Sequence, residues 1–343
     1  MTRCEIWRVS KQSGRKGKSM EGFSLIGRGT ADRDKTLKER QTRVDQFFES
    51  NEQRAETYFV TAELEKAVDV ALTLGRPLLL TGEPGSGKTL AAFWVASKLG
   101  LPKDHFHEFQ VRSDSRAIDI CYNFDAVSWF RQSQIASAPV EKSDYIEPRE
   151  LGLAFGWREP EMTLPHVVLI DEIDKAPRDF PNDLLLELDQ MKFKILETGR
   201  VIGPPAVRPI IIITSNSERR LPDPFLRRCI THHIEITFDT VKEILKARLA
   251  AYRKKVPGGA KDQDLVQAGA TFYSGLSALE GRLSRKPTVA EFWQWLILAS
   301  EYPDSTTVDL VSTLSTPRGP MIEKLPRINA LFVPSDLKVV SNG

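Results

Sequence analysis

The stretch Gly82-Glu-Pro-Gly-Ser-Gly-Lys-Thr89 carries the most specific chemistry in the chain. It matches the pattern G-x-x-x-x-G-K-[ST], in which glycines let the backbone curl so that successive N–H groups face phosphate oxygens. In such a loop the lysine, here Lys88, reaches the β- and γ-phosphates, and the hydroxyl of Thr89 can hold Mg²⁺. The sequence therefore predicts a nucleoside triphosphate site formed by Gly82, Glu83, Pro84, Gly85, Ser86, Gly87, Lys88, Thr89 and Leu90.

A second group of polar residues ends the apolar run His166-Val-Val-Leu-Ile-Asp171-Glu172. The run is typical of a buried parallel strand, whose C-terminal end is where α/β sheets place ligands. We expect Asp171 to hold Mg²⁺, directly or through water, and Glu172 to polarise a water for attack on the γ-phosphate. The role of Asp174 is left open: it either belongs to this site or caps the next helix.

Two later positions are further candidates. Asn216 follows an apolar strand predicted over 208–214, where it would orient the attacking water or contact the γ-phosphate; a turn-forming asparagine is the alternative. Arg227 and Arg228 precede a strand predicted over 231–238. An arginine there cannot easily reach its own nucleotide but could complete the site of a neighbouring subunit, and a solvated basic pair is the alternative.

The elements around these residues alternate between strands and helices. A helix is predicted from the cap Thr61 to Gly75, because apolar residues recur there at helical spacing. A strand over 77–81, the phosphate loop and a helix over 89–99 begin a βαβ unit. Further along we expect a strand at 106–111, helices at 117–134, 149–155 and 180–191 with a loop at 136–143, a hairpin over 192–202 and a helix capped by Asp239.

Changes in composition divide the chain into four parts. Residues 1–55 form a basic extension that we expect to be loosely ordered, residues 56–238 an α/β core, residues 239–302 a small all-helical domain, and residues 303–343 a proline-rich tail. Lys286 lies just before the last predicted helix of the helical domain and could reach a nucleotide clamped between the two domains.

Composition excludes several classes of protein. The 343 residues carry a net charge of +2, so the whole chain is not an obvious nucleic-acid binder, although the basic extension leaves such a partner open. No apolar run is long enough for a membrane span, and the N-terminus lacks a secretory signal. Three widely spaced cysteines indicate reduced thiols and a cytoplasmic protein. His105 and His107 would share one strand face, but we favour ordinary histidines over a metal site, since no third ligand lies nearby in sequence.

Together these motifs resemble an AAA+ ATPase, most closely the MoxR branch, over residues 56–302. Residues 82–89 look like Walker A, 167–172 like Walker B, Asn216 like sensor 1, and the stretch 221–228 like the one ending in the arginine finger, which places that role on Arg228 with Arg227 as the fallback. The hairpin over 192–202 also suits this branch. The family has an arginine, called sensor 2, at the start of the last lid helix, near the position of Lys286 or Thr288 here. We assign the sensor 2 role to Lys286.

The resemblance implies a P-loop fold, with a three-layer αβα core around a parallel sheet and a helical lid. It also implies a chaperone-like, Mg²⁺-dependent ATPase that assembles into a ring, a hexamer, and remodels a protein client, commonly with a partner that carries a von Willebrand A domain. Two other classes remain as alternatives: a nucleic-acid-directed motor of the restriction or clamp-loading type, and a nucleotide-gated switch of a conflict or signalling system. Spacing alone does not distinguish ATP from GTP.

Overall fold

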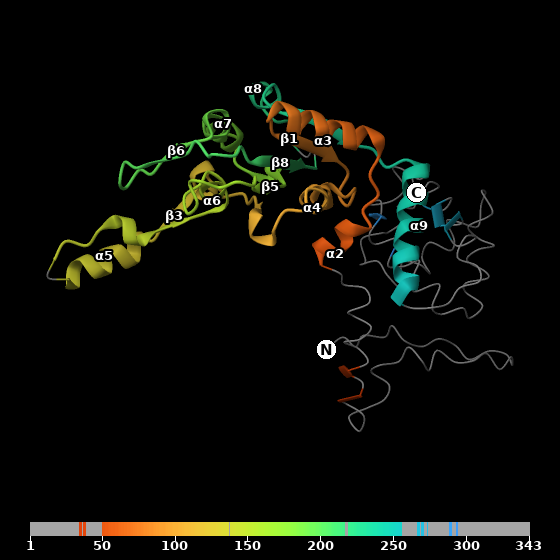
Figure 1. The fold of residues 1–343 in the computed structure, drawn as a ribbon, viewed down its shortest axis with the longest axis horizontal. Helices are drawn as coiled ribbons and strands as arrows, with labels where there is room; N and C mark the ends of the chain where they lie inside the picture. Colours follow the sequence, from red (N-terminus) through yellow and green to blue (C-terminus); the bar gives the residue numbers. More distant parts are fainter. Residues whose placement is uncertain are drawn as a thin grey trace, which may run out of the picture.

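The computed structural model describes residues 50–136, 138–216 and 219–255, together with isolated positions at 34, 35, 37, 38, 266, 267, 269, 270, 273, 288, 289 and 293. Its centre is a five-stranded sheet in the order β2-β5-β8-β1-β9 (Figure 1). Every pairing in this sheet is parallel. The strands are β1 (Leu78–Gly82), β2 (Phe106–Gln110), β5 (Val167–Asp171), β8 (Ile210–Ser215) and β9 (Ile230–Ile234).

One face of the sheet packs against α2 (Asn51–Glu56), α3 (Ala62–Leu74) and α4 (Lys88–Lys98). The side chain of Thr61 caps α3, as predicted, and Gly75 ends it in the left-handed conformation that glycine adopts without strain. Ser50 and Gln53 form a capping box that starts α2 inside the predicted N-terminal extension. The buried residues of this layer include Ala55, Leu64, Val68, Ala71, Leu78, Leu80, Ala92, Val95, Leu169 and Ile212.

The opposite face packs against α6 (Glu150–Ala154), α7 (Phe180–Gln190) and α8 (Asp223–Leu226). Successive strand residues point to opposite faces of the sheet, so the strand residues that pack in this layer alternate with those of the first layer. Its buried members include Leu79, Leu151, Val168, Ile170, Phe180, Leu184, Ile211, Ile213 and Phe225. Helices on both faces of a parallel sheet confirm the predicted three-layer αβα core.

The segment between β2 and β5 differs from the prediction. In place of one helix over 117–134, the structure has a 3₁₀ turn η4 (Ala117–Ile120), β3 (Tyr122–Phe124) and α5 (Ala126–Ile135). The prediction was wrong because β3 pairs with β4 (Ile146–Pro148), a distant strand that helical spacing could not reveal. The loop predicted over 136–143 runs into the 3₁₀ turn η5 (Lys142–Tyr145). Figure 1 shows α5 far from the sheet, at the end of an arm that begins at β3.

The other elements predicted within the described residues are present, with different bounds. The hairpin over 192–202 is present as β6 (Phe193–Lys194) and β7 (Val201–Ile202). The last strand ends at Ile234, earlier than predicted, where its partner β1 ends at Gly82, and α9 (Phe238–Lys255) follows. The backbone N–H of Thr240 bonds to the Thr237 hydroxyl, so Thr237, and not the predicted Asp239, fills the cap position.

Much of the remaining chain lies outside the described residues, including Lys286 and most of the predicted lid and tail. None of the helices within the described ranges combines the length and the apolar character needed to cross a lipid bilayer. Cys121 and Cys229 are both buried free thiols.

Candidate nucleotide site

The phosphate loop leaves the C-terminal end of β1 and enters α4. Gly82, Gly85 and Gly87 all have positive φ angles, of 149°, 77° and 94°. A side chain on Gly87 would lie 2.9 Å from the ring of Tyr58, and one on Gly85 would lie 2.6 Å from the Cβ of Thr288. The loop therefore requires glycine both for its backbone angles and for the close approach of its neighbours.

Lys88 lies inside this loop, only 6% exposed. Its ammonium donates hydrogen bonds to the carbonyl oxygens of Gly82 and Glu83, at 2.8 and 2.9 Å. Burial lowers the pKa of Lys88, while the nearby carboxylates of Asp171, Asp174 and Glu172 act in the opposite direction. The side-chain nitrogen of Lys88 is thus held inside the curl of the loop by two backbone carbonyls.

Ser86 supplies a second polar group in the loop. Its hydroxyl oxygen is buried and has no hydrogen-bond partner within the described part of the chain. A buried hydroxyl without a partner costs free energy, so the loop is incomplete as it stands. A phosphate oxygen would satisfy this hydroxyl, and the loop therefore fits a phosphate.

The two predicted metal-binding residues are in direct contact. The Thr89 hydroxyl donates to the Asp171 carboxylate, 3.0 Å from Oδ1 and 3.3 Å from Oδ2. Thr214, at the end of β8, donates to the same Oδ1 at 2.6 Å and accepts the Glu172 N–H at 2.9 Å. Hydroxyl and carboxylate oxygens are the hard ligands that Mg²⁺ prefers, so the donor set fits this ion.

Glu172 directly follows β5 in a strained conformation, with φ at 60°. Three side chains surround its carboxylate. Asn216 donates from Nδ2 to Oε1 at 3.2 Å, Gln110 donates from Nε2 to Oε2 at 2.6 Å, and Lys175 forms an ion pair with Oε2. The structure thus brings together Glu172 and Asn216 from two neighbouring strands, at the edge where the phosphate loop lies.

The structure decides between the two roles considered for Asp174, a part in this site or the cap of the next helix. Asp174 is 3% exposed, and its Oδ1 accepts the backbone N–H of Asn216 at 3.1 Å. The N-cap of α7 is Asp179, so Asp174 does not cap that helix. Its carboxylate instead fixes the backbone from which the Asn216 side chain projects.

Arg228 lies away from this cluster. Its Nε donates to Asp189 Oδ2 at 2.6 Å, and together they line a cavity of about 250 Å³ that also includes Pro77. Pro77 precedes the first residue of β1, whereas the phosphate loop follows the last. Within one chain, Arg228 is therefore placed at the opposite end of β1 from the loop.

Three residues in the cluster were not predicted: Gln110, Thr214 and Lys175. Gln110 and Thr214 stand at or near the C-terminal ends of β2 and β8, as Asp171 does on β5. The sequence signal that could have found Gln110 and Thr214 is the polar residue at the end of each apolar strand. The strand order was needed to show which of these polar residues lie next to one another. At the predicted sensor 2 position, Lys286 lies outside the described residues, whereas Thr288 packs on Gly85.

A glycine loop between a buried strand and a helix, with Thr89 and Asp171 in contact at the same sheet edge, defines a P-loop nucleotide-binding domain. Comparison with protein families narrows this class. The family model described as "ATPase family associated with various cellular activities (AAA)" matches residues 78–238, the stretch that holds all five strands of the sheet. Residues 78–238 are therefore similar to an AAA ATPase domain. No curated protein matches the chain.

Proposed function

We propose that this protein is a Mg²⁺-dependent ATPase of the AAA+ class that forms a ring and uses ATP hydrolysis to remodel a protein client. One observation carries the proposal: Lys88, Thr89, Asp171, Glu172 and Asn216 lie at a single edge of the sheet, joined by direct hydrogen bonds from Thr89 to Asp171 and from Asn216 to Glu172. The family match over residues 78–238 supports the ATPase class.

Binding of the triphosphate rests on the loop. We propose that the ammonium of Lys88 turns from the loop carbonyls to the β- and γ-phosphates, and that Ser86 and the loop N–H groups donate to phosphate oxygens. The N-terminus of α4 adds the positive end of its dipole. Leu90 is buried in the first turn of that helix.

Mg²⁺ would be held by Thr89 and Asp171, where it neutralises charge on the phosphates. Glu172 would accept a proton from the attacking water, and Asn216 would hold that water or the γ-phosphate in place. Gln110 and Lys175 contact the same carboxylate, so Glu172 must leave them, at least in part, to reach a water. Arg228 would act on the nucleotide of the neighbouring subunit, which its place at the end of β1 opposite its own phosphate loop supports.

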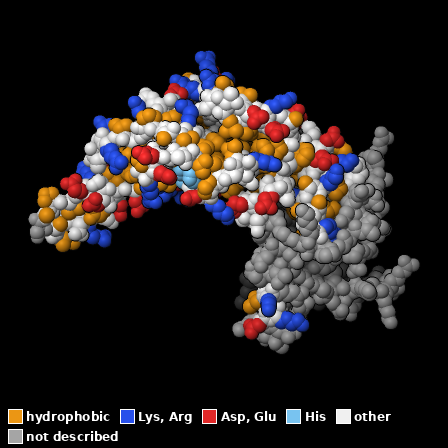
Figure 2. Space-filling model, in the orientation of Figure 1, with side chains coloured by type: hydrophobic (Ala, Val, Ile, Leu, Met, Phe, Trp, Pro, Cys, Tyr) orange, Lys and Arg blue, Asp and Glu red, His pale blue; other side chains and the backbone are white. Residues whose placement is uncertain are grey.

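The proposal also includes a protein client on which the ATPase acts. Support comes from the arm, where the apolar side chains of Val127, Phe130 and Ile135 on α5 are 69%, 59% and 73% exposed. Figure 2 shows apolar side chains gathered over this end of the molecule. The resemblance to the MoxR branch adds a partner with a von Willebrand A domain and a hexameric ring.

The experiment is ATP turnover by purified Glu172→Gln protein. The variant keeps the size of the side chain but loses the base, so we expect ATP binding to persist and turnover to fall by ~10² or more. Glu161→Gln, an exposed glutamate away from the site, is the matched control and should retain the wild-type rate. Undiminished turnover in Glu172→Gln would refute the assigned role of Glu172.

The shared site has its own test. Arg228→Ala and Lys88→Ala should each be inactive alone, and mixing them should restore part of the activity if Arg228 of one subunit serves the intact loop of another. An absence of rescue would argue against a site in trans. Stimulation of turnover by DNA, with steep salt dependence, would instead favour the nucleic-acid motor. Tight nucleotide retention without steady-state turnover would favour the switch.

A further inference from the structure

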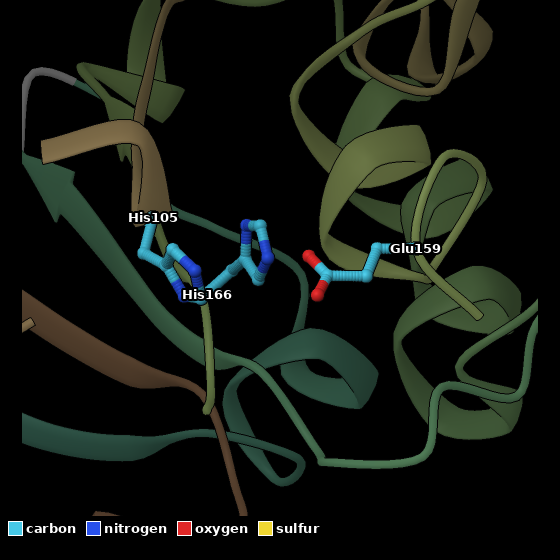
Figure 3. A group of neighbouring side chains, drawn as sticks. All are labelled: His105, Glu159 and His166. Carbon is cyan, nitrogen blue, oxygen red and sulfur yellow. The ribbon is translucent and has the colours of Figure 1, made fainter. Parts of the chain in front are cut away.

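Two histidines and a glutamate converge at the edge of the sheet opposite the phosphate loop. His105 ends the 3₁₀ turn η3 (Lys103–His105) just before β2, His166 directly precedes β5, and Glu159 lies in the loop after α6. One nitrogen of each ring and one carboxylate oxygen lie within 4.8 Å of one another (Figure 3). The N-terminal ends of parallel strands lie away from their C-terminal ends, so this cluster is separate from the nucleotide site.

Hydrogen bonds fix which nitrogen of each histidine faces the cluster. His105 Nδ1 lies 3.2 Å from the carbonyl oxygen of Pro165, so in the neutral ring Nδ1 donates and Nε2 carries the lone pair. His166 Nδ1 lies 2.7 Å from Nε2 of His107. A histidine that binds a metal through one nitrogen commonly holds its other nitrogen in a hydrogen bond, which sets the tautomer and the ring orientation.

The Nε2 atom of His166 is the least satisfied group in the cluster. His166 is 7% exposed, and this nitrogen has no hydrogen-bond partner in any described segment. A buried ring nitrogen without a partner is unfavourable unless something binds it. Figure 3 shows the His166 ring facing the carboxylate of Glu159, so the missing partner would lie between them.

We propose that His105, His166 and Glu159 bind a Zn²⁺ ion, with water as the fourth ligand. Imidazole nitrogen suits Zn²⁺ and other first-row transition metals, whereas Mg²⁺ and Ca²⁺ prefer oxygen. Two histidines and a glutamate form a known zinc ligand set.

The His105 ring and the Glu159 side chain must reorient to close on an ion. Tetrahedral Zn²⁺ with bonds of ~2.0–2.1 Å holds its ligand atoms roughly 3.3 Å apart. The rings of His105 and His166 stack with centroids 4.2 Å apart and an angle of 22° between their planes. An ion lies in the plane of each ring that binds it, so the half-buried His105 ring must turn, and the exposed Glu159 side chain can approach freely.

Bound zinc would connect three separate segments. It would join the loop after α6, through Glu159, to the starts of β2 and β5. Since β5 ends in Asp171, the ion would anchor the strand that leads to the nucleotide site from its far end. His107 acts as a positioning residue, because it holds His166 without facing the ion.

The test is Zn²⁺ binding to full-length, tag-free protein that has been stripped with chelator, measured by calorimetry and by metal analysis after desalting. Excess Mg²⁺ and the absence of nucleotide keep Zn²⁺ from the oxygen ligands around Asp171. We expect one Zn²⁺ per chain, lost in His105→Gln and weakened at least 10-fold in Glu159→Gln. The matched controls are His233→Gln and Glu161→Gln, both on the surface, which should bind as wild type does.

Two further readouts separate binding from folding. Zn²⁺ should raise the unfolding temperature of wild type but not of His105→Gln, while both should unfold alike in chelator. His107→Phe should weaken Zn²⁺ by about 10–100-fold without abolishing it. Co²⁺ in place of Zn²⁺ should give the intense visible bands of tetrahedral coordination. Wild-type binding no tighter than that of His105→Gln, or a weak octahedral Co²⁺ spectrum, would overturn the proposal.

Discussion

Thr214 offers the sharpest test of how the nucleotide site is held together. Its hydroxyl is completely buried, donates to Asp171 Oδ1 at 2.6 Å and accepts the backbone N–H of Glu172 at 2.9 Å. Replacing it with valine keeps the shape of the side chain and the strand propensity of β8 but removes both hydrogen bonds. The two residues that Thr214 joins are those assigned to the metal and to the attacking water.

The expected loss follows from these two bonds. A hydrogen bond to a charged group contributes about 1.5–3 kcal/mol, and a buried N–H left without a partner costs about 1–3 kcal/mol. We therefore expect Thr214→Val to lower the free energy of unfolding by about 3–5 kcal/mol. At roughly 2–4 °C per kcal/mol for a domain of this size, the unfolding temperature should fall by about 10 °C.

Thr214→Ser is the matched control, since it keeps the hydroxyl and loses only a methyl group, which costs about 1 kcal/mol. Thermal unfolding of the three proteins at the same concentration, without nucleotide, gives the comparison. ATP turnover should also fall further in the valine variant than in the serine variant, because Glu172 loses its backbone anchor. A valine variant as stable as the serine variant would refute the assignment of both bonds.

Three further predictions rest on other features. Gly87→Ala should weaken nucleotide binding, measured with a fluorescent ATP analogue, because the new Cβ would lie 2.9 Å from Tyr58. The control is Gly100→Ala, at a glycine that also has a positive φ but has nothing within 4 Å of the new Cβ. This control should lose about 1–2 kcal/mol of stability and bind nucleotide normally. Lys88→Met keeps most of the side-chain length but removes the charge, and should lower affinity for ATP by at least 10-fold in the same assay; equal affinity would contradict a phosphate contact. Cys121 and Cys229 should resist alkylation in the native protein at pH 8 and react after unfolding, since burial raises the pKa of both thiols, that of Cys229 to about 12; peptide mapping of the alkylated protein would show any early modification.

Local pattern was sufficient for most of the core. The helix from Thr61 to Gly75 and the glycine loop were predictable because caps, glycines and apolar spacing act between residues near in sequence. The same reasoning failed over 117–134, where β3 depends on β4 beyond α5. Helical spacing describes one face of one segment, and it carries no information on a strand partner far along the chain.

The sequence by itself predicted a triphosphate-binding loop, and it identified Asp171, Glu172 and Asn216 as candidate partners of that loop, since each of them closes or follows an apolar strand. Only the tertiary structure decided which of the polar residues at the ends of strands lie next to one another. The order β2-β5-β8-β1-β9 brings Gln110 beside Glu172 and Thr214 beside Asp171, because neighbouring parallel strands end at one edge. The same packing joins His105, His166 and Glu159 at the other edge. No spacing along the chain encodes that contact, because strand order, and not sequence distance, sets which residues become neighbours.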